Sequence, residues 1–183
     1  MLAILSSLPK SVTRTIRLDE DLDTAIQDRA RDSKMAVNYL VNRAVRRLIE
    51  WDIPSEQIGM VAMPMTLVTS LFGQIDEQSC TKLGKMVSVE FFKPFAEYLF
   101  GEFSVYTSIM LFKRIAEYGR SFVFDTSSDS RKHLLVLRHG RGRKLSVYYA
   151  SLIEGVFHDL LGRQVEVEYT DALCMSQLAN SVS

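Results

Sequence analysis

Polar side chains that could recognise another molecule gather near the start of the chain, in the stretch SVTRTIRL (residues 11–18). If this stretch is extended, Thr13, Thr15 and Arg17 point to one side, because successive side chains of a strand alternate between its faces. Hydroxyl and guanidinium groups donate hydrogen bonds, and hydroxyl groups also accept them. The chemistry that this row of residues suits is recognition through hydrogen bonds.

Residues suited to catalysis or metal binding are sparse. His133 and His139 would face the same way on a strand but lie roughly 20 Å apart, too far to share an ion within one chain. Cys80 and Cys174 are distant from them in the sequence. The stretch HGRGRKL (residues 139–145) has two glycines but lacks the third glycine of a dinucleotide-binding loop. The motifs of a phosphate-binding loop, a zinc protease and a nucleophile elbow are also absent from the sequence. We therefore expect no catalytic residues, no metal and no cofactor.

Two amphipathic helices are predicted after the polar stretch. The first begins at Asp19, with carboxylates in its first turn, where they favour the positive end of the helix dipole. Leu22, Ile26 and Ala30 form its narrow apolar stripe. After a break at residues 32–35, the second helix has a broad apolar face. A strand and two helices in about 40 residues cannot bury these faces alone, so we expect a second copy of the chain to supply the partner strand.

The segment TIRLDEDLDTAIQDRARDSKMAVNYLVNRAV (residues 15–45) resembles the ribbon-helix-helix family of DNA-binding proteins, of the MetJ/Arc/CopG type. The resemblance covers about residues 10–50. It depends on the spacing of Leu18, Leu22 and Ile26 and on VNYLVNRAV after the turn. It implies an intertwined homodimer in which an antiparallel ribbon lies over four helices.

The resemblance also implies which residues contact double-stranded DNA. They are Thr13, Thr15, Arg17, Lys34, Val37 and Asn38. In that family the ribbon enters the major groove, where side chains at the first three positions read base edges, and Arg17 could pair with guanine. The start of the second helix, at Val37 and Asn38, binds a phosphate through free backbone N–H groups.

Two positions depart from the family pattern. A glycine is common where Lys34 stands, because the first helix must end with a left-handed residue. A serine or threonine cap is common where Ala36 stands. We expect these departures to alter the turn and its phosphate contact but not the ribbon.

The composition narrows the function classes without naming a partner. The 183 residues include 22 basic and 22 acidic side chains, so only the distribution of charge is informative. Basic residues precede the first helix and lie along the second, whereas acidic residues concentrate on the first. The two separated cysteines indicate a reducing compartment. Because neither a signal sequence nor a membrane span is recognisable, we expect a cytoplasmic protein that does not contact membranes.

Pro54, in EWDIPSE, is predicted to end the helical pattern and to mark a domain boundary. We predict a ribbon-helix-helix domain over residues 1–52 and an α+β domain over residues 58–178. The second domain should contain several helices and then a small sheet packed by one helix. Its expected elements are helical patterns over 64–92 and 104–119, strands at 121–125 and 132–139 around a turn at 126–130, a helix over 143–162, and an alternating stretch over 164–175.

Two features of the second domain leave alternatives open. A basic cluster could extend the DNA footprint, bind an anion or simply be solvated; it comprises Arg131, Lys132, Arg138, Arg141, Arg143 and Lys144. Aromatic residues are dense between Phe91 and Phe112, where helical spacing indicates core, although a ligand pocket is an alternative.

The segment YYASLIEGVFHDLLGRQVEVEYTDALCM (residues 148–175) resembles the closing helix and strands of the 4-vinyl-reductase-type domain, a small-molecule-binding α/β fold. The glycine and second cysteine expected after such a strand pair are missing. The resemblance implies a module that senses a ligand, dimerises, or does both.

Together these patterns predict a dimeric, sequence-specific DNA-binding regulator of transcription, such as a repressor, with or without a small-molecule effector and higher oligomers. One alternative is an antitoxin-type protein with a toxin partner, but such tails usually fold only on the toxin, and this one is long, apolar and periodic. The other is an enzyme or ligand-binding protein whose ribbon serves only dimerisation.

Overall fold

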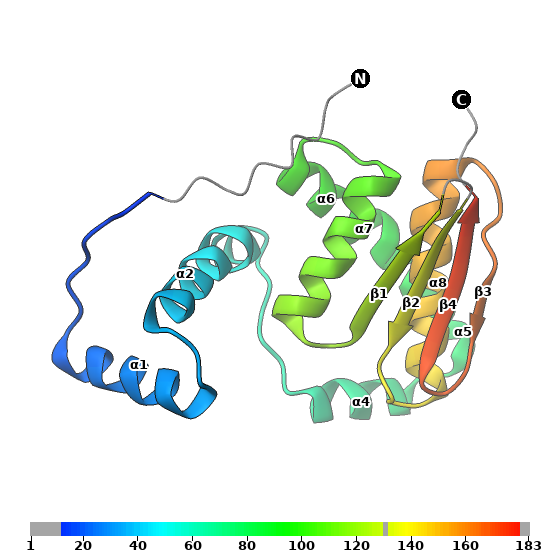
Figure 1. The fold of residues 1–183 in the computed structure, drawn as a ribbon. Helices are drawn as coiled ribbons and strands as arrows, with labels where there is room; N and C mark the ends of the chain where they lie inside the picture. Colours follow the sequence, from blue (N-terminus) through cyan, green and yellow to red (C-terminus); the bar gives the residue numbers. More distant parts are fainter. Residues whose placement is uncertain (1–11, 130–131, 180–183) are drawn as a thin grey trace, which may run out of the picture. The chain divides into compact units, whose positions relative to one another are not determined.

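The computed structural model describes residues 12–129 and 132–179. The chain divides between Arg46 and Arg47 into two compact units. We call them the N-terminal unit and the C-terminal unit and describe each by itself (Figure 1).

The N-terminal unit holds two helices joined by a tight turn. α1 spans Glu20–Ser33 and α2 begins at Val37 and ends at Arg47, which confirms both predicted helices. α1 ends because Lys34 is left-handed, with φ 53° and ψ 38°. The N–H groups of Lys34 and Met35 then donate to the carbonyls of Arg31 and Ala30, the pattern of a Schellman motif. The predicted left-handed residue is therefore present without the glycine that usually supplies it.

The predicted ribbon strand is not formed within the single chain. Residues 12–19 are neither helix nor strand, and Ser11 lies outside the described residues. Because the expected pairing is with a second chain, the ribbon and the intertwined dimer stay predictions.

The first half of the C-terminal unit is helical. Its segments, with η marking a π-helical turn, are η1 (Leu48–Asp52), α3 (Ile53–Gln57), α4 (Met65–Gln74), α5 (Glu77–Val87), η2 (Ser88–Phe92), α6 (Lys93–Phe100), α7 (Val105–Arg114) and η3 (Ile115–Gly119). No helix in the described ranges has both the length and the hydropathy needed to cross a membrane.

Two prolines lie at the second position of α-helices that begin directly after π-helical turns. Pro54 is the second residue of α3, after η1, and Pro94 is the second residue of α6, after η2. Proline lacks an N–H and cannot complete an α-helical hydrogen bond, but the wider π-helical turn changes the hydrogen-bond pattern just before it. The prediction that Pro54 ends the helical pattern is therefore wrong, because the helix continues to Gln57.

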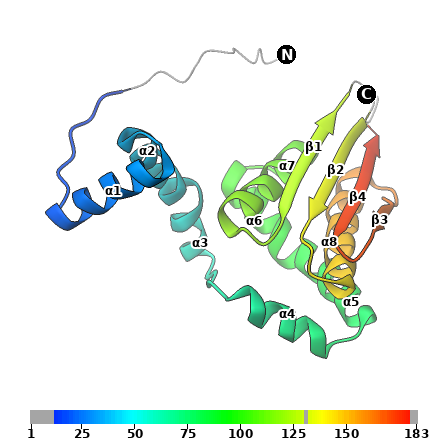
Figure 2. The same ribbon diagram turned by 60° about the horizontal axis from the view of Figure 1, so that its bottom comes forward.

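Four strands form one antiparallel sheet in the order β1-β2-β4-β3. The strands are β1 (Val123–Ser128), β2 (Lys132–Arg138), β3 (Val167–Tyr169) and β4 (Leu173–Ala179). Between β2 and β3, helix α8 (Arg143–Leu161) lies against one face of the sheet in both ribbon views (Figure 1 and Figure 2). This arrangement confirms the predicted α+β class and the packed helix. The predicted turn at 126–130 begins too early, because β1 pairs with β2 as far as Ser128.

The core of the C-terminal unit lies between the sheet and its helices. β2 buries Leu135 and Leu137, which pair in register with the buried Ser176 and Cys174 of β4. Phe112 of α7 brings aromatic rings together, with ring centroids 4.5 Å from Phe92, 5.2 Å from Phe124 and 6.3 Å from Phe157.

The single tryptophan of the sequence, Trp51 of η1, is part of this core. It is 5% exposed and its ring lies 6.1 Å from that of Phe95 and 5.9 Å from that of Tyr118. Its fluorescence should therefore report the folding of the C-terminal unit.

Helices α5 and α8 approach each other closely at two glycines. A Cβ atom on Gly84 would lie 2.5 Å from the carbonyl oxygen of Tyr148 and 2.9 Å from the amide nitrogen of Leu152. A Cβ on Gly155 would lie 2.3 Å from Oγ of Ser88. At Gly84 the backbones of α5 and α8 are in direct contact because the glycine carries no side chain, whereas at Gly155 the added atom would meet the Ser88 side chain of η2.

Candidate functional site

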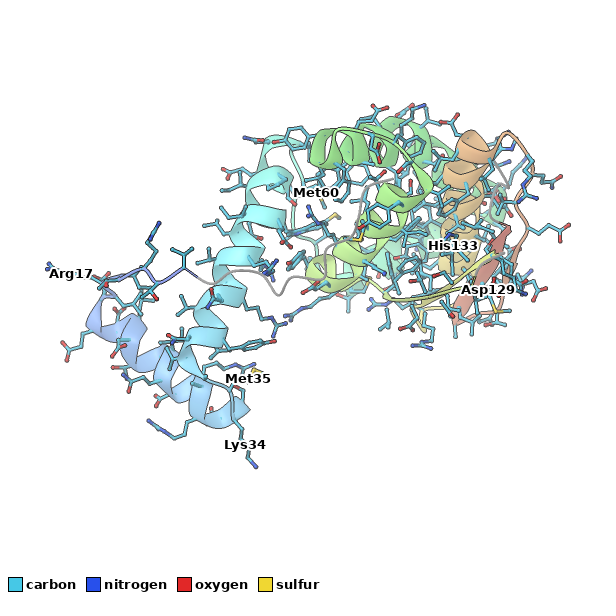
Figure 3. The ribbon with its side chains drawn as sticks, turned by 45° about the horizontal axis from the view of Figure 1, so that its top comes forward. Arg17, Lys34, Met35, Met60, Asp129 and His133 are labelled. Atoms are coloured by element: carbon cyan, nitrogen blue, oxygen red, sulfur yellow. The ribbon has the colours of Figure 1, made fainter. Side chains whose placement is uncertain are left out.

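The residues predicted to read DNA bases precede α1. Thr13, Thr15 and Arg17 are exposed and lie in the irregular stretch before the helix. Figure 3 shows Arg17 at this end of α1, with its side chain directed away from the helix. Their side chains are therefore free to contact a partner.

The other residues predicted to contact DNA gather at the opposite end of α1. Lys34 occupies the turn, and Val37 and Asn38 begin α2 (Figure 3). α1 has 14 residues, which separates the two groups by about 21 Å at 1.5 Å per residue. The structure thus brings Lys34, Val37 and Asn38 together and holds Thr13, Thr15 and Arg17 apart from them.

The start of α2 is suited to an anion. Ala36 precedes α2 and has no side-chain acceptor for the N–H groups of Val37 and Asn38. The first turn of α2 has no acidic residue, whereas the first turn of α1 carries Glu20, Asp21 and Asp23. The positive end of the α2 dipole is therefore not neutralised by a carboxylate of its own first turn.

The N-terminal unit exposes the apolar side chains that a dimer would bury. Within its described part, residues 12–46, only Ala30 is buried. Leu22 is 54% exposed and Val45 is 53% exposed. In the single chain the described part of this unit therefore has no apolar core of its own.

Replacing Lys34 by glycine is expected to stabilise the turn between α1 and α2 by about 1 kcal/mol, because glycine adopts the left-handed conformation without the clash that a Cβ atom causes. Amide hydrogen exchange in α1 and α2 should slow about fivefold as a result. Asp32→Gly, inside α1, is the matched control and should speed exchange by a similar factor. Equal exchange in Lys34→Gly and the wild type would contradict the strain assigned to Lys34.

The C-terminal unit contains an apolar cavity of about 290 Å³. Its walls come from α4, α5, η2, α7, η3, α8 and the residues before β1. Val68, Phe72, Val87 and Leu152 are among the apolar lining residues. The polar side chains at its wall are Ser121, Tyr148 and Tyr149. The aromatic density noted in the sequence thus serves both a core and a pocket.

Burial shapes the polar groups of this unit. It raises the pKa of Tyr148 and of Tyr149, so both phenols stay protonated at neutral pH. It also raises the pKa of Cys174 to about 12, and the Cys174 thiol donates to the carbonyl of Ser146 at 3.3 Å. A thiol of this kind is a poor nucleophile.

Several members of the basic cluster noted in the sequence have partners in the structure. Arg138 pairs with Asp125, and Arg143 pairs with Glu77 at 2.9 Å. Lys144 donates to the carbonyl of Gly73 at 2.8 Å. Arg131 lies outside the described residues. The cluster is therefore not one free cationic surface, and the acids that pair with it come from elsewhere in the sequence.

His139 is neutral and has a defined tautomer. The backbone N–H of Arg141 donates to its Nδ1 at 3.1 Å, so the proton is on Nε2, which lies 2.9 Å from Oγ of Ser146. Burial and the nearby charge of Arg141 lower the pKa of His139. Across residues 12–129 and 132–179, no group of three or more metal-ligating side chains is arranged to hold an ion.

We expect the C-terminal unit to lose stability as the pH falls below about 6.5, the ordinary pKa of histidine. The unfolded chain takes up a proton on His139 at a higher pH than the folded chain, so the loss begins near the unfolded pKa and ends below the lowered folded one. The measurement is the melting temperature from Trp51 fluorescence at pH 7.5 and pH 5.5. His139→Gln should reduce the difference, and an unchanged difference would contradict the assignment.

Sequence reasoning left a ligand pocket among the aromatic residues open as an alternative but did not identify Ser121, which lines the cavity, or the neighbouring Arg120. The available signal was Gly119, which the sequence pattern predicts as the end of a helix. Arg120 follows it directly, just beyond the end of η3.

No protein-family model, curated protein or solved structure matches this chain. The resemblances to the ribbon-helix-helix family and to the 4-vinyl-reductase-type domain therefore stay predictions.

Proposed function

We propose that this chain is a dimeric, sequence-specific DNA-binding regulator of transcription. The observation that supports it most is the N-terminal unit, a two-helix hairpin with a left-handed turn and without a core of its own. Two such units would bury Leu22, Val45 and their neighbours against each other. The stretch before α1 would then pair with its copy as an antiparallel ribbon.

In this arrangement the two ends of α1 have different roles. The ribbon places Thr13, Thr15 and Arg17 in the major groove, where Arg17 could pair with O6 and N7 of guanine. Lys34 and the free N–H groups at Val37 and Asn38 hold a phosphate and fix the register of the ribbon on the duplex. Base contacts supply specificity and phosphate contacts supply position.

The C-terminal unit would strengthen the dimer, sense a small ligand, or do both. A ligand that changes the spacing of two ribbons alters whether both can meet their half-sites at once. A regulator of this kind would act in the cytoplasm, where it would repress or activate transcription by occupying its operator.

The test is fluorescence anisotropy of the full chain with a randomised duplex pool at two salt concentrations, followed by sequencing of the bound fraction. We expect an inverted-repeat motif and an affinity that falls steeply with salt. No binding at low salt, by a protein shown to be a folded dimer, would mean that the ribbon only joins two chains.

A further inference from the structure

Two cavities of the C-terminal unit adjoin at Ser121 and Phe122. The first is the apolar cavity described above, and the second has a volume of about 260 Å³. Ser121 and Phe122 line both. The second cavity is also lined by Arg120, Arg138 and Arg141, so an apolar chamber lies beside a cationic one.

Two of the three arginines have no carboxylate partner. Arg138 is paired with Asp125. Nε of Arg141 donates to the carbonyl of His139 at 3.2 Å, and within the described residues no ion pair involves Arg120 or Arg141. His139 adds no charge, because its Nδ1 accepts from the N–H of Arg141 and so carries no proton. The second cavity is therefore lined by two arginines that no carboxylate of the described residues neutralises.

The backbone conformation of Arg120 indicates a functional role for its side chain. Arg120 is left-handed, with φ 53° and ψ 24°, a conformation that glycine adopts without cost. Arginine here places a strained backbone at the mouth of a cavity, and such strain concentrates at binding sites. Two π-helical turns, η2 and η3, also contribute to the apolar wall through Phe91, Phe92 and Ile115, and π-helical turns are frequent at functional sites.

A polar path joins the two chambers. Tyr149 and Ser121 both line the apolar cavity, and Ser121 also lines the second cavity. The ring of Tyr149 lies 5.3 Å from that of His139, whose carbonyl holds Arg141. The hydroxyl groups of Tyr149 and Ser121 thus lie on the route from the apolar chamber to the arginines.

We propose that the two cavities form one site for a small amphipathic organic acid, with its apolar body in the first cavity and its carboxylate on Arg120 and Arg141. The apolar cavity equals about ten water volumes, which suits a body of about a dozen non-hydrogen atoms. A carboxylate matches the planar guanidinium fork in geometry and charge. This inference rests on the proposed function only where it makes the acid an effector of DNA binding. Binding of the acid to the C-terminal unit does not itself require DNA.

The test is isothermal titration calorimetry of the full chain without DNA. The probes are 3-phenylpropionate and octanoate, each compared with its own amide, a neutral molecule of similar shape. We expect the acids to bind with a Kd below about 1 mM and the amides at least about tenfold more weakly. Arg120→Gln and Arg141→Gln should each weaken the acids roughly tenfold or more and leave the amides unchanged.

Two further variants separate the parts of the site. Arg43→Gln, an exposed arginine of α2, is the matched control and should bind the acids like the wild type. Val68→Phe adds volume to the apolar wall and should weaken acids and amides alike. The proposal is overturned if neither acid binds while Trp51 fluorescence reports a folded C-terminal unit, or if acids and amides bind equally. Acid binding by a protein that ignores DNA would keep this inference and refute the proposed function.

Discussion

Replacing Gly84 by alanine is expected to destabilise the C-terminal unit by about 3 kcal/mol or more. The new Cβ atom would lie 2.5 Å from the carbonyl oxygen of Tyr148, a backbone atom of α8 that cannot rotate away. α5 and α8 would have to separate, and contacts along both helices would loosen. Urea unfolding followed by Trp51 fluorescence should show a midpoint about 1–3 M lower than that of the wild type.

Gly73→Ala is the matched control for this experiment. Gly73 lies in α4, where an added Cβ would meet no atom within 4 Å. Alanine there should raise stability by up to about 1 kcal/mol, because it favours the helix over the unfolded chain. If Gly84→Ala unfolds at the same urea concentration as the wild type, the close crossing of α5 and α8 is refuted.

Arg17→Ala is expected to weaken binding to the preferred operator by about 1–3 kcal/mol, roughly 5- to 150-fold, and to relax the base preference at one position of each half-site. Arg17 is exposed before α1, so its removal should leave both helices and the dimer intact. The measurement is anisotropy with the selected operator and with single-base variants of it. Sedimentation of the unbound protein checks the dimer.

Asn38→Asp provides the contrasting result. A negative charge at the start of α2 should repel a phosphate and weaken binding to every sequence alike. Comparing the two variants therefore distinguishes a residue that recognises bases from a residue that binds phosphate. If Arg17→Ala binds the preferred operator as tightly as the wild type, the stretch before α1 is not the reader.

Much of the fold could be predicted from periodicity and stop signals. The ends of α1 and α8 follow from the break near Lys34 and from Gly162, and β2 follows from its run of apolar residues. Pro54 was misjudged because a π-helical turn before it changes the hydrogen bonding, and single-sequence patterns carry no signal for such a turn. The break that separates α4 from α5 was also missed, although Gly73 near the end of α4 and Asp76, whose side chain caps α5, were available signals.

The candidate sites differ in how much of each could be predicted from the sequence. The residues at both ends of α1 are local in sequence, so a pattern in one segment identifies them. The two adjoining cavities are assembled from α4 through α8, and tertiary packing alone brings Arg120 and Arg141 to one place. The carboxylates that pair with the basic cluster, those of Asp125 and Glu77, likewise could not be identified from the residues next to the cluster in the sequence.

The strand order β1-β2-β4-β3 has a consequence for how the C-terminal unit folds. Each hairpin, β1–β2 and β3–β4, can form locally, but the central pairing joins Lys132 to Ala179 and encloses all of α8. Closing that loop requires α8 to be docked first, or at the same time, at an entropic cost. Until then β2 presents an open hydrogen-bonding edge with apolar side chains. A chain in which α8 has not yet docked would therefore be open to mispairing with another chain at this edge.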